Sequence, residues 1–392
     1  MKFPPFCPND ECSHHWYDLD PGPSIQEPGE ERQWYAPAGY YSTKAFGRVR
    51  RFRCRSCGRY FSEQTFSLDY FNKRPISYET VFRRIVGGSG VRTISRDMGV
   101  SHQIILNRIS RLARQGIAVH AVLASLIGLD ENLAADGFES FVDSQYEPNN
   151  IHLLVGSRSQ FLYSFDYAHL RRKGRMTEEQ KQERERRYEW RVRDRISISE
   201  SFSRIVSMIE DLIATRPCGE EGQPERTVLF TDKKIEYVRC LNSSEILKEL
   251  KRQDRFSLIR ISSRKARTIT NRLFPVNYMD RQVRKDNANQ FRETVQFSRN
   301  VNNCLDRMSV YQLYHNYCKP FRIGKPEEEK LRHGEVAGIE RGKIDGQLTD
   351  LFTRRRFFSR LRLSCSQLRM WFRMVGNVGK LTGGFYPKYV WM

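Results

Sequence analysis

Two close pairs of cysteines near the start of the chain have residue types and a spacing that suit metal binding. The stretches CPNDEC and RCRSCGR contribute the four thiols, which are Cys7, Cys12, Cys54 and Cys57. Two such pairs, separated by a longer stretch, typically hold one zinc ion in a tetrahedron. His14 and His15 could replace one ligand, although four cysteines already complete the set. A small domain with little apolar sequence needs such a cross-link, so residues 1–70 are expected to form a zinc ribbon.

Two aspartates beside apolar runs indicate a second kind of metal chemistry. Asp136 lies within LAADGFESF, and Asp232 directly follows the run VLFT. A carboxylate beside an apolar core costs free energy unless a cation compensates its charge. Carboxylate oxygens suit Mg²⁺, and two such ions about 3.5–4 Å apart can activate a nucleophile and stabilise a leaving oxygen. The alternative for Asp232 is a strand-end acid paired with Lys233 and Lys234.

The elements between residues 127 and 322 must position these acids. Alternating and apolar stretches predict three consecutive strands over residues 132–141, 149–157 and 160–169. A charged helical insertion follows near residues 170–195, and then come a helix, a strand, a helix, a strand and a long helical region. This order is the layout of the ribonuclease H-like fold. We therefore expect a multidomain α/β protein with a ribonuclease H-like mixed sheet and surrounding helices.

Residues 71–126 predict an all-α helix-turn-helix domain for DNA binding. A short helix is followed by a turn at Gly99 and by a longer helix whose N-cap is Ser101. One face of the longer helix is apolar, and the opposite face carries side chains suited to a DNA major groove. These side chains are Gln103, Asn107, Arg111 and Arg114. A plain amphipathic helix with a solvated polar face would show the same pattern.

The charge of the chain indicates a polyanionic partner. Among 392 residues, 67 are Lys or Arg and 46 are Asp or Glu, which gives a formal net charge of +21. Such an excess points first to nucleic acid, and the length suggests roughly two or three domains. No apolar run reaches the ~18 residues of a membrane span, and the N-terminus lacks a secretory signal. We therefore expect a cytoplasmic protein without a membrane partner, whose cysteines are not a disulfide framework.

The combination of these features resembles bacterial insertion-sequence transposases of the DDE/DDD type. The resemblance rests on the cysteine ribbon, the helix-turn-helix and the stretches ADGFESF, FTDKK, NYMDRQVRK, RETVQFSRN and YHNYCKPFR, and it covers residues 5–320. It implies cleavage at element ends by metal-activated water, followed by attack of a 3′-OH on target DNA. It also implies catalytic Mg²⁺ or Mn²⁺, double-stranded DNA as partner, a homo-oligomer on DNA and a location at the prokaryotic nucleoid.

The resemblance also implies which acids would be catalytic and would bind the ions. Carried over by position, these are Asp136, Asp232 and Asp280, the last of which lies in NYMDR. Glu293 in RETVQFSRN is the alternative for the third position.

The last segment of the chain, residues 323–392, forms a basic and aromatic C-terminal region. It interleaves Arg with Phe and Trp in TRRRFFSRLRLS and QLRMWFRMVG. This composition suits contact with a DNA backbone and stacking, or an interface for self-association. For the whole chain, two other functions are alternatives: a DNA-binding regulator derived from a transposase, and a tyrosine recombinase that would not need Mg²⁺.

Overall fold

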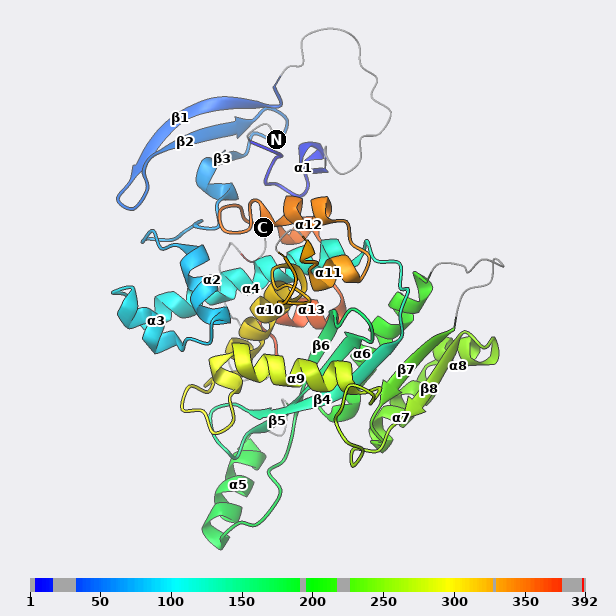
Figure 1. Cartoon of the computed structure of the whole chain (residues 1–392). Helices are drawn as coiled ribbons and strands as arrows, with labels where there is room; N and C mark the ends of the chain where they lie inside the picture. The colour runs from blue at the N-terminus through cyan, green and yellow to red at the C-terminus, as the bar shows by residue number, and fades with distance from the viewer. Residues whose placement is uncertain are drawn as a thin grey trace. The chain divides into compact units, whose positions relative to one another are not determined.

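The computed structural model describes most of the chain, whose contacts divide it into two compact units (Figure 1). The described residues are 4–16, 33–190, 195–216, 226–326, 329–375 and 390. Unit 1 comprises residues 1–79, 350–362 and 384–392, and unit 2 comprises residues 80–349 and 363–383. Parts of three predicted domains lie outside the described residues. They are residues 1–3 and 17–32 of the zinc ribbon, 191–194 and 217–225 of the catalytic domain, and 327–328, 376–389 and 391–392 of the C-terminal region.

Unit 1 is built on a small antiparallel sheet whose strands follow in chain order. The strands β1 (Tyr35–Thr43), β2 (Gly47–Cys54) and β3 (Tyr60–Ser62) pair in the order β1-β2-β3. A helical turn, α1 (Ser13–Trp16), precedes the sheet, and a 3-10 helix, η1 (Glu63–Phe66), follows it. In β2 the arginines lie on the more exposed positions while Val49 and Phe52 are buried.

The apolar core of unit 1 contains a residue from near the C-terminus. Phe357 is buried, and its ring lies 4.9 Å from that of Phe6 and 5.5 Å from that of Phe66, measured between centroids. The Arg355 backbone N–H donates to the Phe66 carbonyl at 2.8 Å. Residues 350–362 therefore complete the core around the sheet, chiefly through the aromatic ring of Phe357.

The expected C-terminal region, residues 323–392, consequently does not form one element. The helices α11 (His333–Val336), α12 (Arg341–Leu348) and α13 (Cys365–Trp371) belong to unit 2, whereas the 3-10 helix η5 (Phe358–Arg360) belongs to unit 1. The aromatic residues of this region serve packing in both units, because Phe357 is 3% exposed and Trp371 is 1% exposed.

The main sheet of unit 2 has five strands and is mixed, as the sequence predicts for an α/β fold. The strands are β4 (Leu133–Phe141), β5 (Pro148–Gly156), β6 (Leu162–His169), β7 (Thr227–Thr231) and β8 (Phe256–Arg260). Their spatial order is β6-β5-β4-β7-β8. The first three form an antiparallel meander, and β4, β7 and β8 are parallel to one another. Strand β5 is almost entirely buried, and besides its apolar run LLV it contains the buried polar residues Asn149, Asn150 and His152.

Helices cover both faces of this sheet and connect its strands (Figure 1). Helix α6 (Ile198–Ala214) contacts β5 and β6, and α9 (Phe274–Asp286) contacts β4 and β5. His152 on β5 contacts Ser201 of α6 (Nδ1 to Oγ, 2.8 Å) and pairs with Gly137 in the ladder. Because neighbouring residues of a strand alternate between faces, Asp136 lies on the face opposite α6. The charged α5 (Glu178–Trp190) precedes α6, and α7 (Ile235–Ser243) and α8 (Glu245–Arg252) join β7 to β8.

A long helix, α4 (His102–Ala124), connects the predicted helix-turn-helix with the rest of unit 2. It follows α2 (Tyr78–Val86) and α3 (Val91–Asp97), and it packs on α10 (Val301–Tyr317), α12 and α13. Residues 111–120 of this helix are all buried, including the polar residues Arg111, Arg114, Gln115 and His120. Residues 80–126 thus belong to the same compact unit as the sheet. No helix in the described part of the chain is long and apolar enough to cross a membrane.

Candidate functional site

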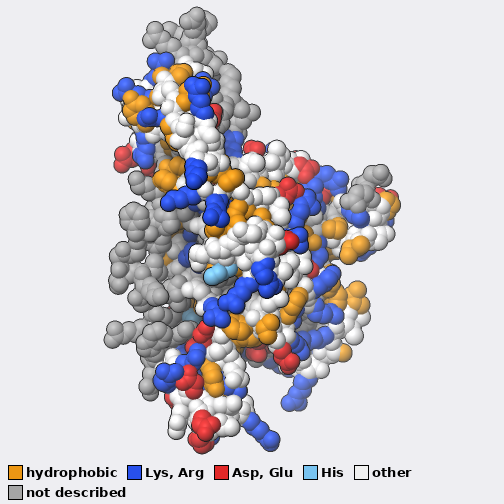
Figure 2. Space-filling view, turned by 90° about the vertical axis from the view of Figure 1, so that its left-hand side faces the viewer, with side chains coloured by type: hydrophobic (Ala, Val, Ile, Leu, Met, Phe, Trp, Pro, Cys, Tyr) orange, Lys and Arg blue, Asp and Glu red, His pale blue; other side chains and the backbone are white. Residues whose placement is uncertain are grey.

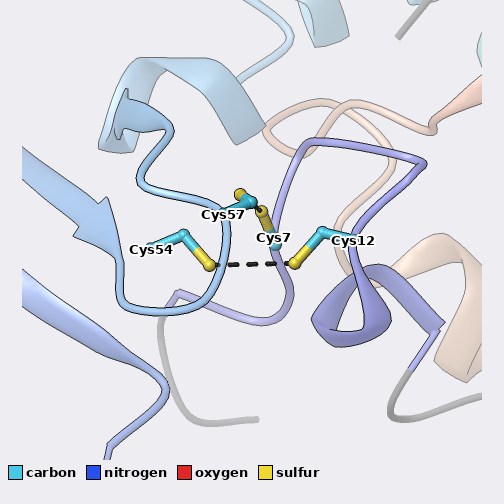
Figure 3. Close-up of side chains that lie close together, drawn as sticks. All are labelled: Cys7, Cys12, Cys54 and Cys57. Atoms are coloured by element: carbon cyan, nitrogen blue, oxygen red, sulfur yellow. Dashed lines mark hydrogen bonds between the residues drawn. The ribbon is translucent and has the colours of Figure 1, made fainter.

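The four cysteines predicted from the sequence come together in unit 1 (Figure 3). The Sγ atoms of Cys7 and Cys57 are 3.6 Å apart, and those of Cys12 and Cys54 are 3.8 Å apart. All four sulfur atoms lie within 4.8 Å of one another. Four thiolates in a zinc tetrahedron with bonds of about 2.3 Å would have sulfur–sulfur distances of about 3.8 Å. The arrangement is therefore compatible with a structural zinc site.

Tight backbone turns present these thiols. The N–H of Gly58 donates to the Cys54 carbonyl at 3.1 Å, and Gly58 has a φ of +71°, which favours glycine. His15 does not join the ligand set, because its Nδ1 contacts the Cys7 carbonyl at 2.7 Å and its Nε2 contacts Ser359 Oγ at 2.9 Å. It supports the turn around Cys7 from inside the core, where it is fully buried.

The thiols differ in how readily they ionise. Burial raises the pKa of Cys7 and of Cys12 above the usual value. Burial also opposes ionisation of Cys57, but hydrogen bonds from the Arg59 backbone and from the neighbouring thiols lower its pKa to about 7. A bound zinc ion would compensate the four negative charges, which otherwise repel one another in a partly buried cluster.

Two of the predicted acids lie side by side at one edge of unit 2's sheet. Strands β4 and β7 are parallel neighbours, and Ala135 pairs with Thr231. The next residues, Asp136 and Asp232, therefore lie beside each other on one face. The Oδ1 atom of Asp136 accepts the Gly137 N–H at 2.7 Å, and Oδ1 of Asp232 accepts the Lys234 N–H at 3.0 Å.

The third acid of this group comes from α9. Asp280 is close enough to Asp136 that the carboxylate of Asp136 raises its pKa. Oδ1 of Asp280 is buried and has no hydrogen-bond partner among the described residues. Glu293, in contrast, is exposed in a loop with a φ of +55°. The structure thus places Asp280, and not the exposed Glu293, beside Asp136.

Burial and the repulsion between neighbouring carboxylates raise the pKa of Asp136 and of Asp280. The pKa of Asp136 is raised to about 6, by burial and then by Asp232, while Lys234 and Arg267 act in the opposite direction. The pKa of Asp280 is raised to about 7, by burial and then by Asp136. In the described part of the chain, only the four cysteines form a group of three or more metal-ligand residues with all ligand atoms within 4.8 Å. The three carboxylates are therefore more widely spread than a single-ion site.

Of the basic residues near these aspartates, the sequence pointed to Lys234 but not to Arg267 or Arg284. The Arg284 guanidinium lies 4.4 Å from the centroid of the Phe138 ring and donates to the Glu139 carbonyl at 2.8 Å. Lys234 and Arg267 are near enough to lower the pKa of Asp136. Lys233 and Lys234 directly follow Asp232 in the sequence and could therefore be associated with it. Arg267 and Arg284 are distant from Asp136 in the sequence, and only the fold brings them near the aspartates.

The glycine after Asp136 has a steric role. A Cβ atom at Gly137 would lie 2.1 Å from Oδ1 of the buried Asn150 on β5. The absence of a side chain at Gly137 therefore leaves room for the buried Asn150 side chain, beside the residue that carries the Asp136 carboxylate.

The residues expected to face a DNA groove differ in exposure along α4. Gln103 is exposed and Asn107 is half-buried, but Arg111 and Arg114 are 4% and 7% exposed. Arg114 donates from Nε to the Trp371 carbonyl at 3.0 Å and from Nη1 to Ser110 Oγ at 2.8 Å. The expectation of a single polar, accessible face is wrong for the two arginines, because α10 and α13 cover that part of the helix.

Comparison with known proteins adds no family assignment. No protein-family model matches the chain, and no curated protein matches it.

Proposed function

We propose that this chain is a metal-dependent DNA transposase of the DDE/DDD type, with a ribonuclease H-like catalytic domain in unit 2. The observation that carries the proposal is the meeting of Asp136, Asp232 and Asp280 from two neighbouring parallel strands and one helix. The strand order β6-β5-β4-β7-β8, with an antiparallel meander followed by two parallel strands, supports it. That sheet order is the one expected for ribonuclease H-like nucleotidyl transferases.

The chemistry of the three aspartates fits divalent cations. A buried carboxylate oxygen without a hydrogen-bond partner, as in Asp280, is costly unless a cation compensates it. Asp136 and Asp232 each use one oxygen in a backbone hydrogen bond, and the other oxygen has no hydrogen bond among the described residues. Two ions about 3.5–4 Å apart also need ligands spread more widely than one ion does.

In this proposal the three aspartates hold Mg²⁺ or Mn²⁺, which would supply a nucleophile at neutral pH and charge to stabilise the leaving oxygen. The chain's own residues orient the reactants. The hydrogen bonds to Asp136 and Asp232 fix the direction of each carboxylate. Lys234 and Arg267 supply positive charge beside the acids, which attracts the phosphodiester that is to be cut.

The remaining features support DNA as the substrate. Lys and Arg side chains are spread over the face shown in Figure 2, in keeping with the net charge of +21. In unit 1 the four cysteines would hold a structural zinc ion. The exposed start of α4, with Gln103, would contact the DNA ends, and we propose that a homo-oligomer acts on the two ends. The resemblance of the sequence to insertion-sequence transposases is consistent with this assignment.

The test is strand transfer on a donor DNA that carries the sequences flanking the gene. We expect activity with Mg²⁺ or Mn²⁺, none when the divalent ion is omitted, and loss of activity without loss of DNA binding in Asp232→Asn. Asp254→Asn is the matched control, because Asp254 is exposed in a turn with a φ of +54° that Asn tolerates. DNA binding without any cleavage by the wild type would instead favour a non-catalytic regulator.

A further inference from the structure

A second site in unit 2 is a pocket of about 630 Å³ that shares no lining residue with the three aspartates. Its walls come from the starts of α3 and α4 and from residues 295–307. The volume lies within the range of about 300–1,000 Å³ that is typical of pockets for small organic groups. The pocket is therefore large enough for more than a single inorganic ion.

The deepest cation of this pocket is Arg307, which is 4% exposed. Its guanidinium donates from Nη1 to Asn289 Oδ1 at 3.0 Å. It has no ion pair among the described residues, and burial lowers its pKa to about 10. A buried cation without a counter-charge is unfavourable. An anion that enters the pocket would relieve this cost.

Three more arginines surround the opening and reinforce this preference. Arg92, Arg96 and Arg299 are exposed, line the pocket, and have no ion pair in the described part of the chain. The lining includes no Asp or Glu. Four guanidinium groups around one pocket favour phosphate, because the planar fork of arginine matches phosphate oxygens in bidentate hydrogen bonds.

The rest of the wall suits an organic group attached to that phosphate. Val91, Leu106 and Phe297 provide apolar surface, and Gln296 and Asn303 provide amides that can both donate and accept hydrogen bonds. A flat aromatic base can pack on such apolar surface, and its edge can bond to the amides.

We propose that this pocket binds one nucleotide of a DNA strand, with a phosphate at Arg307 and the base against the apolar wall. The proposal rests on the proposed function in taking DNA as the ligand. It adds a second contact point for the strand, at the start of the helix-turn-helix and separate from the three aspartates. An unstacked, single-stranded nucleotide is required, since a base that stays paired within a duplex could not reach into the pocket.

The experiment measures binding of a fluorescein-labelled ten-nucleotide thymidine strand to the full-length protein by anisotropy at several salt concentrations. The double variant Arg92→Ala/Arg299→Ala should bind at least about tenfold more weakly, and its salt slope should fall by about one for each lost phosphate contact. The control Arg175→Ala/Arg239→Ala removes the same charge from exposed sites of unit 2 outside the pocket. Equal losses in both doubles would overturn the proposal, because the arginines would then act only through net charge.

A variant of the buried residue gives an independent readout. Arg307→Met keeps an unbranched side chain, although a shorter one, and removes the uncompensated charge, so the melting temperature of the free protein should stay the same or rise. The stabilisation that the oligonucleotide gives to the wild type should disappear in this variant. If Arg307→Met binds and is stabilised like the wild type, the phosphate assignment is wrong. If it fails to fold, the double variant decides.

Two further experiments ask whether the pocket binds a DNA strand or a free phosphate compound, and whether binding depends on the three aspartates. Thymidine monophosphate and pyrophosphate should compete with the labelled strand only at much higher concentrations, and competition at equal concentrations would mean that the site serves a free phosphate compound. Asp232→Asn should bind the strand like the wild type. If the pocket variants lose binding but Asp232→Asn still cleaves DNA, the pocket stands and the proposed catalytic mechanism fails.

Discussion

At the scale of single residues, Asp136 and Asp280 resist ionisation because they are buried and repel each other. Their pKa values, about 6 and about 7, lie above the value near 4 of an unfolded aspartate. Each group therefore binds its proton more tightly in the folded protein than in the unfolded chain. Their contribution to stability is fully present below pH 4 and is lost as the pH rises to about 7. In between, the free energy of unfolding falls by about 1.4 kcal/mol per pH unit for each proton that the folded protein binds and the unfolded chain does not.

The first prediction follows from this sign. Without added divalent ions, Asp280→Asn should be more stable than the wild type at pH 8 and nearly equal to it at pH 4, because the variant has no carboxylate to ionise. Added Mg²⁺ should stabilise the wild type more at pH 8 than at pH 5, since ions compete with protons for the carboxylates. Thermal melts across this pH range test both expectations. An identical pH profile for the wild type and Asp280→Asn would contradict them.

The identity of the third acid makes a second prediction at this scale. Asp280→Asn should lower strand transfer by about 10³-fold or more, because bound ions supply several kcal/mol of transition-state stabilisation. Glu293→Gln should keep activity near that of the wild type, because Glu293 is exposed and outside the cluster. The two rates, measured with Mg²⁺ on the same donor DNA, decide the question. A dead Glu293→Gln beside an active Asp280→Asn would reverse the assignment.

The sequence predicted some of these residues and left others open for physical reasons. The four cysteines and Asp136 could be identified from the sequence, because short-range patterns determine their surroundings. These patterns are the close cysteine pairs for the thiols and a strand for Asp136. Asp280 and Glu293 could not be separated from the sequence, because the choice depends on how α9 lies on β4 and β5. The role of Arg307 was not predictable, since nothing in the local sequence indicates that this arginine of α10 is buried and has no ion pair among the described residues.

At the scale of elements, α4 shows that a helical pattern predicts which residues share one face of a helix. The pattern does not predict which other helices cover that face. Gln103 and Arg114 share the polar side of the helix, yet Gln103 is exposed and Arg114 is buried against the Trp371 carbonyl. Tertiary packing by α10 and α13 accounts for the difference. The strands of the meander were predicted well, because each contains apolar or alternating residues and short turns separate them. The division of residues 323–392 between two units depends on long-range packing, so the sequence did not reveal it.

The third prediction separates the two ends of α4. Arg114→Ala should lower the free energy of unfolding of unit 2 by about 2–4 kcal/mol, because it removes charged hydrogen bonds from a buried site. Gln103→Ala should change stability by less than about 0.5 kcal/mol and should weaken binding to the DNA ends more than binding to random DNA. Denaturant melts and binding to both DNAs provide the measurements. A specific DNA defect in a fully stable Arg114→Ala protein would restore Arg114 to the DNA interface.

At the scale of the whole molecule, unit 1 is assembled from segments at opposite ends of the chain. The cysteine ribbon comes from the first 79 residues, and its core requires Phe357 from residues 350–362. The core is small and aromatic, so a metal cross-link at the cysteines would supply a large share of its stability. Unit 2 has its own extensive core around the five-stranded sheet and does not depend on those thiols.

The last prediction is therefore that zinc holds unit 1 together while unit 2 remains folded without it. Purified protein should contain about one equivalent of zinc, and Cys54→Ser should lose it. Limited proteolysis of that variant should cut within residues 33–79 and 350–362, because the ribbon and the Phe357 segment lose their shared core together. The near-ultraviolet signal and melting transition of unit 2 should persist. Cys365→Ser is the control, since it removes an exposed thiol of unit 2 away from the cluster. Wild-type protein that contains no zinc, or a Cys54→Ser ribbon as resistant to protease as the control, would show that packing alone holds the four thiols together.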